Sequence, residues 1–194
     1  YRNYCRENGI SKPGDPQDFQ MIYLVDMEHP GLVVFPTHRL VRDLPNFDKE
    51  AVLEKCSEFF YIDEKEGTDT MEEDLKKLYD EGKKAFGFYC GKGEWFLLTL
   101  KNIDFMSQML PNVSKASQSL DVSVLHTLIL EKIFGIDKEN MAKQINLTYT
   151  KFFTEAIDGV DKGEFQCSFV LNPTRVTEIR DVAAAGEKMP QKST

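Results

Sequence analysis

Three short segments carry residue types that could bind an anion or move a proton. The first is Thr37-His38-Arg39, which follows the apolar run "LVVF" at 32–35. Histidine can act as a general acid or base, and arginine can bind a carboxylate or phosphate through two parallel hydrogen bonds. We predict that His38 and Arg39 lie at an exposed strand end, face a cleft and are catalytic, with Thr37 binding beside them. The alternative is a turn with a solvated arginine and a packed histidine.

The second segment is "NPTR" at 172–175, between a strand-like and a helix-like run. Asn172 is a good N-cap and Pro173 suits the first helical position. A helix N-terminus favours anions, and Arg175 could add a positive charge to it. The segment therefore predicts a phosphate-binding contribution from Arg175, or else an ordinary helix cap.

The third segment, "GEKMPQKST" at 186–194, ends in a cluster of two lysines and two hydroxyls. It is not a nucleotide P-loop, because no glycine precedes the second lysine and a proline interrupts the run. Lys188, Lys192, Ser193 and Thr194 still suit one phosphate-sized anion. We expect the chain to leave its helix at Gly186 and run back towards the cleft at His38, the alternative being a solvated tail.

Other candidates are weaker. His126 lies among apolar residues and is typical of a satisfied core histidine, with a ligand role as the alternative. Gly91-Lys92-Gly93 could cradle an anion, but a hairpin turn explains both glycines. The four cysteines are widely spaced without a CxxC pair, which indicates reduced thiols, and the sequence predicts no metal site.

Composition limits the class of protein. The 194 residues are 41% hydrophobic and 29% charged, as in ordinary globular proteins, and the net charge is −8. A negative net charge does not indicate a surface that binds nucleic acid or an anionic membrane. No apolar run approaches the ~20 residues of a membrane span, and the polar start has no signal-peptide core. We expect a cytoplasmic protein, and we interpret 1–194 as a single-domain C-terminal fragment of a longer chain.

Strand-like and helix-like runs alternate along the sequence. The predicted strands are 19–27, 31–38, a hairpin formed by "KAFGFYC" and "EWFLLTLK", and 165–171. The predicted helices are 46–60, 70–82, 119–136, 148–164 and one from Pro173 to Gly186. The polar run 63–70 is expected to be an exposed loop. Together these indicate an α/β (α+β) fold with a mixed or mainly antiparallel sheet flanked by helices.

The runs "VVFPTHRLV", "SLDVSVLHTLILEKIFGI" and "NPTRVTEIRDVAAAGEKMPQKST" carry a family resemblance over nearly the whole chain. They resemble the C-terminal half of a prokaryotic family known as domain of unknown function one thousand and fifteen. In that family a motif of the type Asp-Gly-His-His-Arg-Tyr lies upstream of the part that "YRNYCREN" resembles, and a Tyr-Phe-rich end follows. Neither is present here.

That upstream motif is similar to one in the ParB and sulfiredoxin superfamily, whose members bind or hydrolyse nucleotides and include kinases of free serine. The resemblance implies nucleotide-dependent phosphoryl transfer to a small hydroxylated metabolite, with ATP or ADP and Mg²⁺ in the full-length protein. It also implies that His38-Arg39 and Lys192-Ser193-Thr194 line one shared site. Phosphoryl transfer relies on positioning and charge neutralisation, which suits a base flanked by cationic clamps.

Three functions stay open at this point. One is the phosphotransferase, another is a non-catalytic module that binds a nucleotide or amino acid, and the third is a structural half that supports an upstream catalytic domain. The expected partner is a small anionic molecule, and a homodimer is an open alternative.

Overall fold

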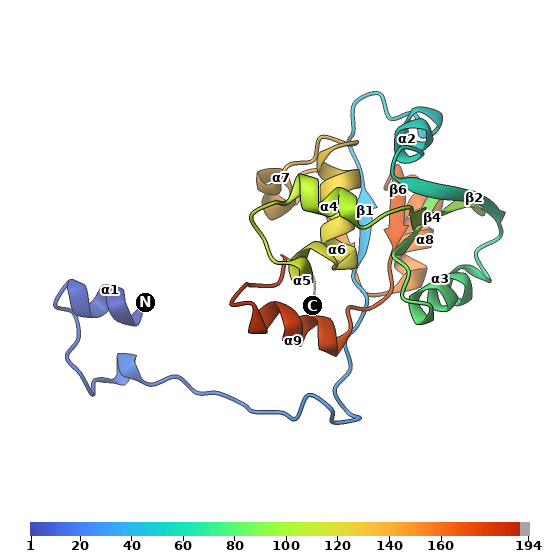
Figure 1. Ribbon diagram of the computed structural model, residues 1–194. Helices are drawn as coiled ribbons and strands as arrows, with labels where there is room; N and C mark the ends of the chain where they lie inside the picture. Colours follow the sequence, from blue (N-terminus) through green and yellow to red (C-terminus); the bar gives the residue numbers. More distant parts are fainter. Residues whose placement is uncertain (191–194) are drawn as a thin grey trace. The chain divides into compact units, whose positions relative to one another are not determined.

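The structure, a computed structural model, describes residues 1–190 (Figure 1). The chain divides into two compact units, Tyr1–Val33 and a second unit that begins at Val34. No helix in the described part of the chain is both long enough and apolar enough to cross a membrane.

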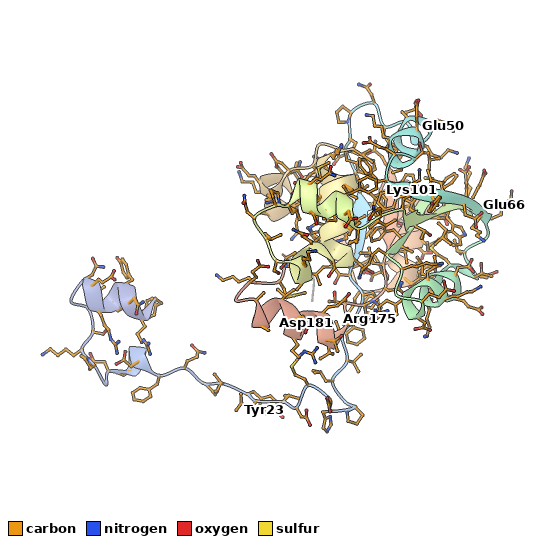
Figure 2. The ribbon with its side chains drawn as sticks, in the orientation of Figure 1. Tyr23, Glu50, Glu66, Lys101, Arg175 and Asp181 are labelled. Atoms are coloured by element: carbon orange, nitrogen blue, oxygen red, sulfur yellow. The ribbon has the colours of Figure 1, made fainter. Side chains whose placement is uncertain are left out.

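The first unit contains helix α1 (Arg2–Glu7) and the short 3₁₀ helix η1 (Pro16–Asp18). Arg6 Nη2 donates to both carboxylate oxygens of Asp18 at 2.8 Å. The strand predicted at 19–27 is wrong, because this stretch forms neither helix nor strand. Its side chains are exposed, as Figure 2 shows for Tyr23, which is 90% exposed. Strand propensity alone does not make a strand when no neighbouring strand supplies the ladder.

The second unit is built on one six-stranded sheet with the spatial order β2-β4-β3-β6-β1-β5. Its strands are β1 (His38–Val41), β2 (Phe60–Glu66), β3 (Ala85–Gly91), β4 (Glu94–Leu100), β5 (Leu147–Thr150) and β6 (Cys167–Val170). Every neighbouring pair is antiparallel, which confirms the predicted antiparallel sheet flanked by helices.

Helices cover both faces of this sheet, on opposite sides of the strands in Figure 1. Alternate strand residues point to opposite faces, so Phe86 and Phe88 enter one core while Ala85 and Tyr89 enter the other. The first core is covered by α2 (Lys49–Cys56), α4 (Asp104–Met109), α6 (Asp121–Val124), the π-helix η2 (Leu125–Glu131) and α7 (Lys138–Lys143). The second is covered by α3 (Met71–Asp80) and α8 (Phe153–Asp161). Two further helices, α5 (Lys115–Gln118) and α9 (Val176–Ala184), pack against each other.

The β3–β4 hairpin confirms the clearest turn signal in the sequence. Lys92 and Gly93 have φ of 56° and 80°, so both central residues adopt the left-handed backbone of a type I′ turn. The Lys92 N–H donates to Asp161 Oδ1 at 2.8 Å, and the Gly93 N–H donates to Tyr89 Oη at 3.0 Å. These N–H groups are used within the fold, which leaves them unavailable for an anion.

Several predicted element boundaries were wrong. The strand predicted at 31–38 begins only at His38, after the proline that cannot donate to a ladder. The helix predicted over 46–60 ends at Cys56, and β2 occupies much of the predicted loop 63–70. The start of the helix predicted at 148–164 is instead β5, which pairs with β1. Arg175, not Asn172, is the N-cap of α9.

Candidate functional site

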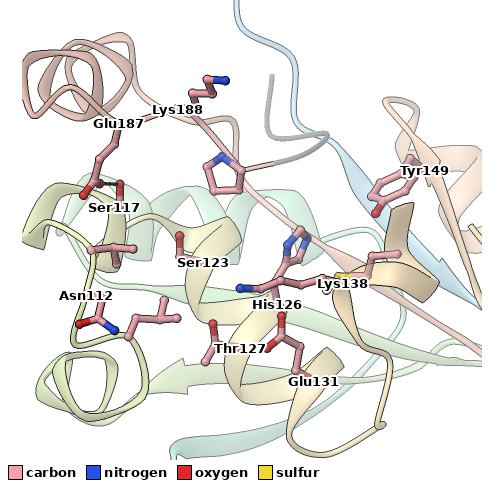
Figure 3. Close-up of a pocket in the computed structure, with 14 residues that line it drawn as sticks. Asn112, Ser117, Ser123, His126, Thr127, Glu131, Lys138, Tyr149, Glu187 and Lys188 are labelled. Carbon is pink, nitrogen blue, oxygen red and sulfur yellow. Dashed lines mark hydrogen bonds between the residues drawn. The ribbon is translucent and has the colours of Figure 1, made fainter. Parts of the chain in front are cut away.

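A cavity of about 630 Å³ lies in the second unit, beside the helices of the first core (Figure 3). Its volume is within the range of small-molecule sites. Three parts of the chain contribute its wall: the α4–α5 region, the η2–α7–β5 region and the segment that follows α9. The lining residues are Leu110, Asn112, Val113, Ser117, Ser123, His126, Thr127, Glu131, Lys138, Met141, Tyr149, Glu187, Lys188 and Pro190.

The π-helix η2 forms one wall of the cavity. The Lys132 N–H donates to the Thr127 carbonyl, five residues earlier, at 3.2 Å. In an α-helix the acceptor would be the carbonyl four residues earlier. Residues five apart, such as His126 and Glu131, therefore lie on the same side of η2. Figure 3 shows Thr127 and Glu131 along this wall. Single π-turns in α-helices are frequent at functional sites, and here the helix presents polar groups from an otherwise apolar sequence.

His126 connects the cavity to β1, which lies between β6 and β5 in the sheet. Its Nε2 lies 3.2 Å from Nη2 of Arg39, which is fully buried in β1. A guanidinium only donates hydrogen bonds, so Nε2 must accept and the imidazole proton must be on Nδ1. Burial, and secondarily the nearby Arg39 charge, lowers the pKa of His126 to about 3. His126 is therefore an uncharged N–H donor at neutral pH.

Tyr149 lies next to Arg39 for a reason of strand register. Arg39 and Tyr149 are directly opposite each other in the β1–β5 pair, and the guanidinium carbon is 5.4 Å from the tyrosine ring centroid. Burial raises the pKa of Tyr149, and the Arg39 charge partly offsets this. The buried hydroxyl of Tyr149 has no hydrogen-bond partner within residues 1–190. It can donate to, or accept from, a ligand in the cavity.

The cavity lining also includes four charged residues, Glu131, Lys138, Glu187 and Lys188, among apolar and uncharged polar ones. Burial raises the pKa of Glu131, and Lys138 partly offsets this rise. On the segment after α9, Glu187 accepts hydrogen bonds from the Ser114 N–H at 2.7 Å and from the hydroxyl of Ser117. These bonds, that from Ser117 first, lower the pKa of Glu187. The cavity thus has one carboxylate engaged in the fold, one with an elevated pKa, and two lysines, Lys138 and Lys188.

The structure separates the two residues predicted to be catalytic. His38 is 2% exposed and Arg39 is 0% exposed, so the expected exposed strand end is wrong. As neighbours on one strand they point to opposite faces of the sheet, and only Arg39 points towards the cavity. His38 Nδ1 accepts from the Leu171 N–H at 3.2 Å, and burial, followed by the Arg39 charge, lowers the pKa of His38 to about 4.

Of the residues predicted to bind the anion, some line the cavity and others do not. Lys188 lines the cavity, together with Glu187 and Pro190, so the chain after α9 does run along the cavity wall that includes His126. Thr37 is half-buried and is not part of the lining; its carbonyl accepts from Arg39 Nη1. Lys192, Ser193 and Thr194 lie outside the described residues.

The Arg175 guanidinium makes its contacts with Tyr79. The guanidinium carbon is 3.9 Å from the Tyr79 ring centroid, and Nη2 donates to the Tyr79 carbonyl. The N-terminus of α9 is capped by Glu178, whose carboxylate accepts from the Arg175 N–H at 2.9 Å. An anion expected at this helix start would meet that carboxylate.

The residues that sequence reasoning missed are Tyr149, Glu131 and, as a cavity residue, His126. The available signal was the presence of histidine, threonine and glutamate at 126, 127 and 131 in an apolar run. Polar residues on a buried helix often mark a cavity rather than a core, but the sequence alone favoured the core interpretation.

Two features of the described residues concern the expected metal and anion sites. Among residues 1–190, no group of three or more histidine, cysteine or carboxylate side chains is placed to hold a metal ion. The glycine-rich turn at 91–93 uses its N–H groups within the fold. The expectation of ATP or ADP and Mg²⁺ in the full-length protein stays a prediction.

An antiparallel sheet between two helical layers, with a cavity beside it, defines an α/β fold. The chain belongs to the family described as "Protein of unknown function (DUF1015)", whose profile matches residues 1–123. The match covers the sequence through Ser123, and the wall formed by His126, Tyr149 and Lys188 follows it. The family resemblance is confirmed, and the likeness to the ParB and sulfiredoxin superfamily stays a prediction. No curated protein and no solved structure matches the chain.

Proposed function

We propose that this protein binds a small anionic metabolite in the cavity. The observation that supports this is the pairing of an uncharged histidine donor, backed by the buried Arg39, with the Tyr149 hydroxyl at the cavity wall. Buried polar groups that lack a partner are costly in a folded protein unless a ligand or water satisfies them. A ligand with oxygen acceptors would satisfy both.

Two lysines of the lining favour a negative charge on that ligand. Lys138 and Lys188 come from different parts of the chain and both contribute to the cavity. A charge-assisted hydrogen bond contributes about 1.5–3 kcal/mol where water is excluded. Glu131, a carboxylate of the lining whose pKa is raised by burial, is the residue we propose to accept the proton of a ligand hydroxyl.

For the reaction, we propose phosphoryl transfer in which the cavity holds the hydroxylated acceptor. This part of the proposal rests on the resemblance to the serine-kinase-like superfamily. His38 is not suited as the base, because it is buried on the opposite face of the sheet from the cavity. The non-catalytic binding module is the second candidate, favoured by the fact that the Nε2 lone pair of His126 is engaged by Arg39 and cannot accept a substrate proton.

Calorimetric titration and a transfer assay test these two candidates. Free serine, glycerate, acetate and inorganic phosphate are titrated into the protein, and labelled ATP with Mg²⁺ is added to each acceptor. Lys188→Ala should weaken binding about tenfold, as expected for one lost charge-assisted bond, with the melting temperature unchanged. Lys162→Ala, which removes an exposed lysine at the end of α8, is the matched control.

The outcomes separate the hypotheses. Saturable binding that depends on Lys188 but gives no labelled product supports the binding module, whereas label transfer supports the phosphotransferase. Equal affinities for wild type and Lys188→Ala, or no binding by any compound of this chemistry, would contradict the cavity as the site and leave the structural role.

A further inference from the structure

We infer that Arg39 is a positioning residue that fixes His126 as an Nδ1–H donor, and that this donor and the Tyr149 hydroxyl form an oxyanion-binding end of the cavity. The first half of this inference is independent of any ligand. The second half rests on the proposed function, because it assigns the end of the cavity that receives the ligand's carboxylate or phosphate group.

The fold places these three groups together by strand register. Arg39 and Tyr149 are cross-strand partners in β1 and β5, and cross-strand neighbours have adjacent side chains. The Arg39 guanidinium is oriented by the Thr37 carbonyl, which accepts from Nη1, and by the Tyr149 ring, 5.4 Å from the guanidinium carbon. Its Nη2 then reaches His126 at 3.2 Å. Arg39 is fully buried and contacts the lining residue His126, so we assign its effect on a ligand to this contact.

The hydrogen bond from Arg39 does two things to the imidazole. It occupies Nε2, so the ring carries its proton on Nδ1 and cannot serve as a general base or as a metal ligand through Nε2. It also polarises the ring, because a donated bond from a cation makes the remaining N–H a stronger donor in a low-dielectric site. An uncharged donor with a buried cation behind it suits an oxygen that carries negative charge.

Tyr149 completes the oxyanion end. Its hydroxyl is buried, lines the cavity and has no partner within the described residues. It can donate to the same ligand oxygen or to its neighbour in a carboxylate or phosphate. A ligand ammonium would be disfavoured here, since both the Arg39 charge and the two donors oppose it, and it would be placed instead near Glu131.

Nitrogen NMR of the histidine side chains tests the first half without any ligand. The described structure gives the three histidines different hydrogen-bond roles. His38 Nδ1 accepts from the Leu171 N–H and His29 Nδ1 accepts from the Gly31 N–H, so both are expected as Nε2–H. His126 is expected as Nδ1–H, assigned by its loss in His126→Asn. An Nε2–H tautomer, or an imidazolium at pH 6, for His126 would overturn the inference.

Two substitutions at Arg39 separate positioning from support of the fold. Arg39→Met removes the donor, and the His126 signals should then show a mixture of tautomers, whereas Arg39→Lys keeps a cationic donor and should restore Nδ1–H. Retention of pure Nδ1–H in a folded Arg39→Met protein would contradict the role of Arg39. If Arg39→Met does not fold, the role of Arg39 is judged from wild type and Arg39→Lys, which should both show His126 as the Nδ1–H tautomer.

The oxyanion end is tested by titrating sodium acetate and inorganic phosphate separately into wild-type protein. The His126 Nδ1–H resonance should shift saturably, with acetate for a carboxylate site or with phosphate for a phosphate site, while His29 stays unchanged. Tyr149→Phe should weaken this binding about tenfold, and Tyr61→Phe, at a side chain that is 66% exposed, should not. No shift at His126 with either anion would overturn the oxyanion end, even if binding dependent on Lys188 persisted.

Discussion

Replacement of Lys84 by methionine should destabilise the second unit more than any surface change. Lys84 Nζ lies 2.8 Å from Asp121 Oδ1 and 2.9 Å from Glu178 Oε1. The three side chains are only 11–18% exposed. These ion pairs connect the residue before β3 to the first turns of α6 and α9. Lys84→Met keeps the length and apolar stem of the side chain but leaves two carboxylates close together without their cation.

The magnitude follows from the cost of an unpaired buried charge. Removal of one partner from a buried ion pair costs about 3–5 kcal/mol, and partial exposure of this cluster reduces that to about 2–4 kcal/mol. For a unit of this size we expect the melting temperature to fall by about 4–15 °C. Lys83→Met is the matched control, because Lys83 is adjacent but 54% exposed in its pair with Glu81, where ion pairs contribute ~0–1 kcal/mol.

The loss should also depend on pH in a defined direction. Burial raises the pKa of Asp121 in the wild type, and Lys84 opposes that rise, so removal of Lys84 raises the pKa of Asp121 further. A carboxyl whose folded pKa exceeds its unfolded value binds more protons when folded, and stability then falls as pH rises between the two values. The unfolded value is about 3.9. The deficit of Lys84→Met should therefore be largest at pH 7 and shrink as the pH approaches 4.

Urea unfolding of wild type, Lys84→Met and Lys83→Met at pH 7 and pH 4.5 gives the comparison. The triple variant Lys84→Met/Asp121→Leu/Glu178→Gln should recover most of the loss, because no charge is left buried and the glutamine oxygen can still accept from the Arg175 N–H. A Lys84→Met protein within about 0.5 kcal/mol of wild type at pH 7 would refute the reasoning, as would a deficit that does not change with pH.

Three further changes have expected outcomes. Gly159→Ala places a Cβ 2.8 Å from Phe165 Cδ2 and should cost about 1–3 kcal/mol in urea unfolding, whereas no loss would show that the ring moves freely aside. Burial, and then the hydrogen bond to Asp161, raise the pKa of Tyr89 to about 12, so the folded state keeps the phenol proton to higher pH than the unfolded state does. The wild type should therefore lose stability between about pH 10 and 12, and Tyr89→Phe should lose less. Identical stability profiles of the two proteins over this pH range would contradict this. Glu187→Gln should speed tryptic cleavage after Lys188 about 2–10-fold, and an unchanged rate would show that the carboxylate does not hold this segment.

The sheet and its hairpin could be predicted because their signals are local. The turn at Gly91–Gly93 and the apolar alternation of its flanking runs sufficed to place β3 and β4. The apolar run 19–27 has equal strand propensity but forms no strand, and the polar run 63–66 is part of β2 because β4 supplies a partner. Pairing between strands distant in sequence decided these cases, and no single segment encodes it.

The site was predicted only in part for a related reason. Thr37-His38-Arg39 was singled out as a polar segment after an apolar run, and of these three residues Arg39 contacts His126 of the cavity lining. The sequence could not show that β1 lies between β6 and β5 in the sheet and is covered on both faces, which buries both His38 and Arg39. Nor could it show that Tyr149 pairs with Arg39, since that contact depends on the β1–β5 register over more than a hundred residues.

The position of Lys188 at the cavity depends on polar anchors at both ends of α9. At the start, Glu178 joins Lys84, while Arg175 stacks on Tyr79. At the end, Glu187 bonds to the N-terminus of α5. Such anchors are directional, so they fix the path of the chain more narrowly than apolar contacts do. Lys84→Met should consequently weaken anion binding as well as stability, although Lys84 does not line the cavity. Affinity that is unchanged in a folded Lys84→Met protein would show that the Glu187 anchor alone positions Lys188.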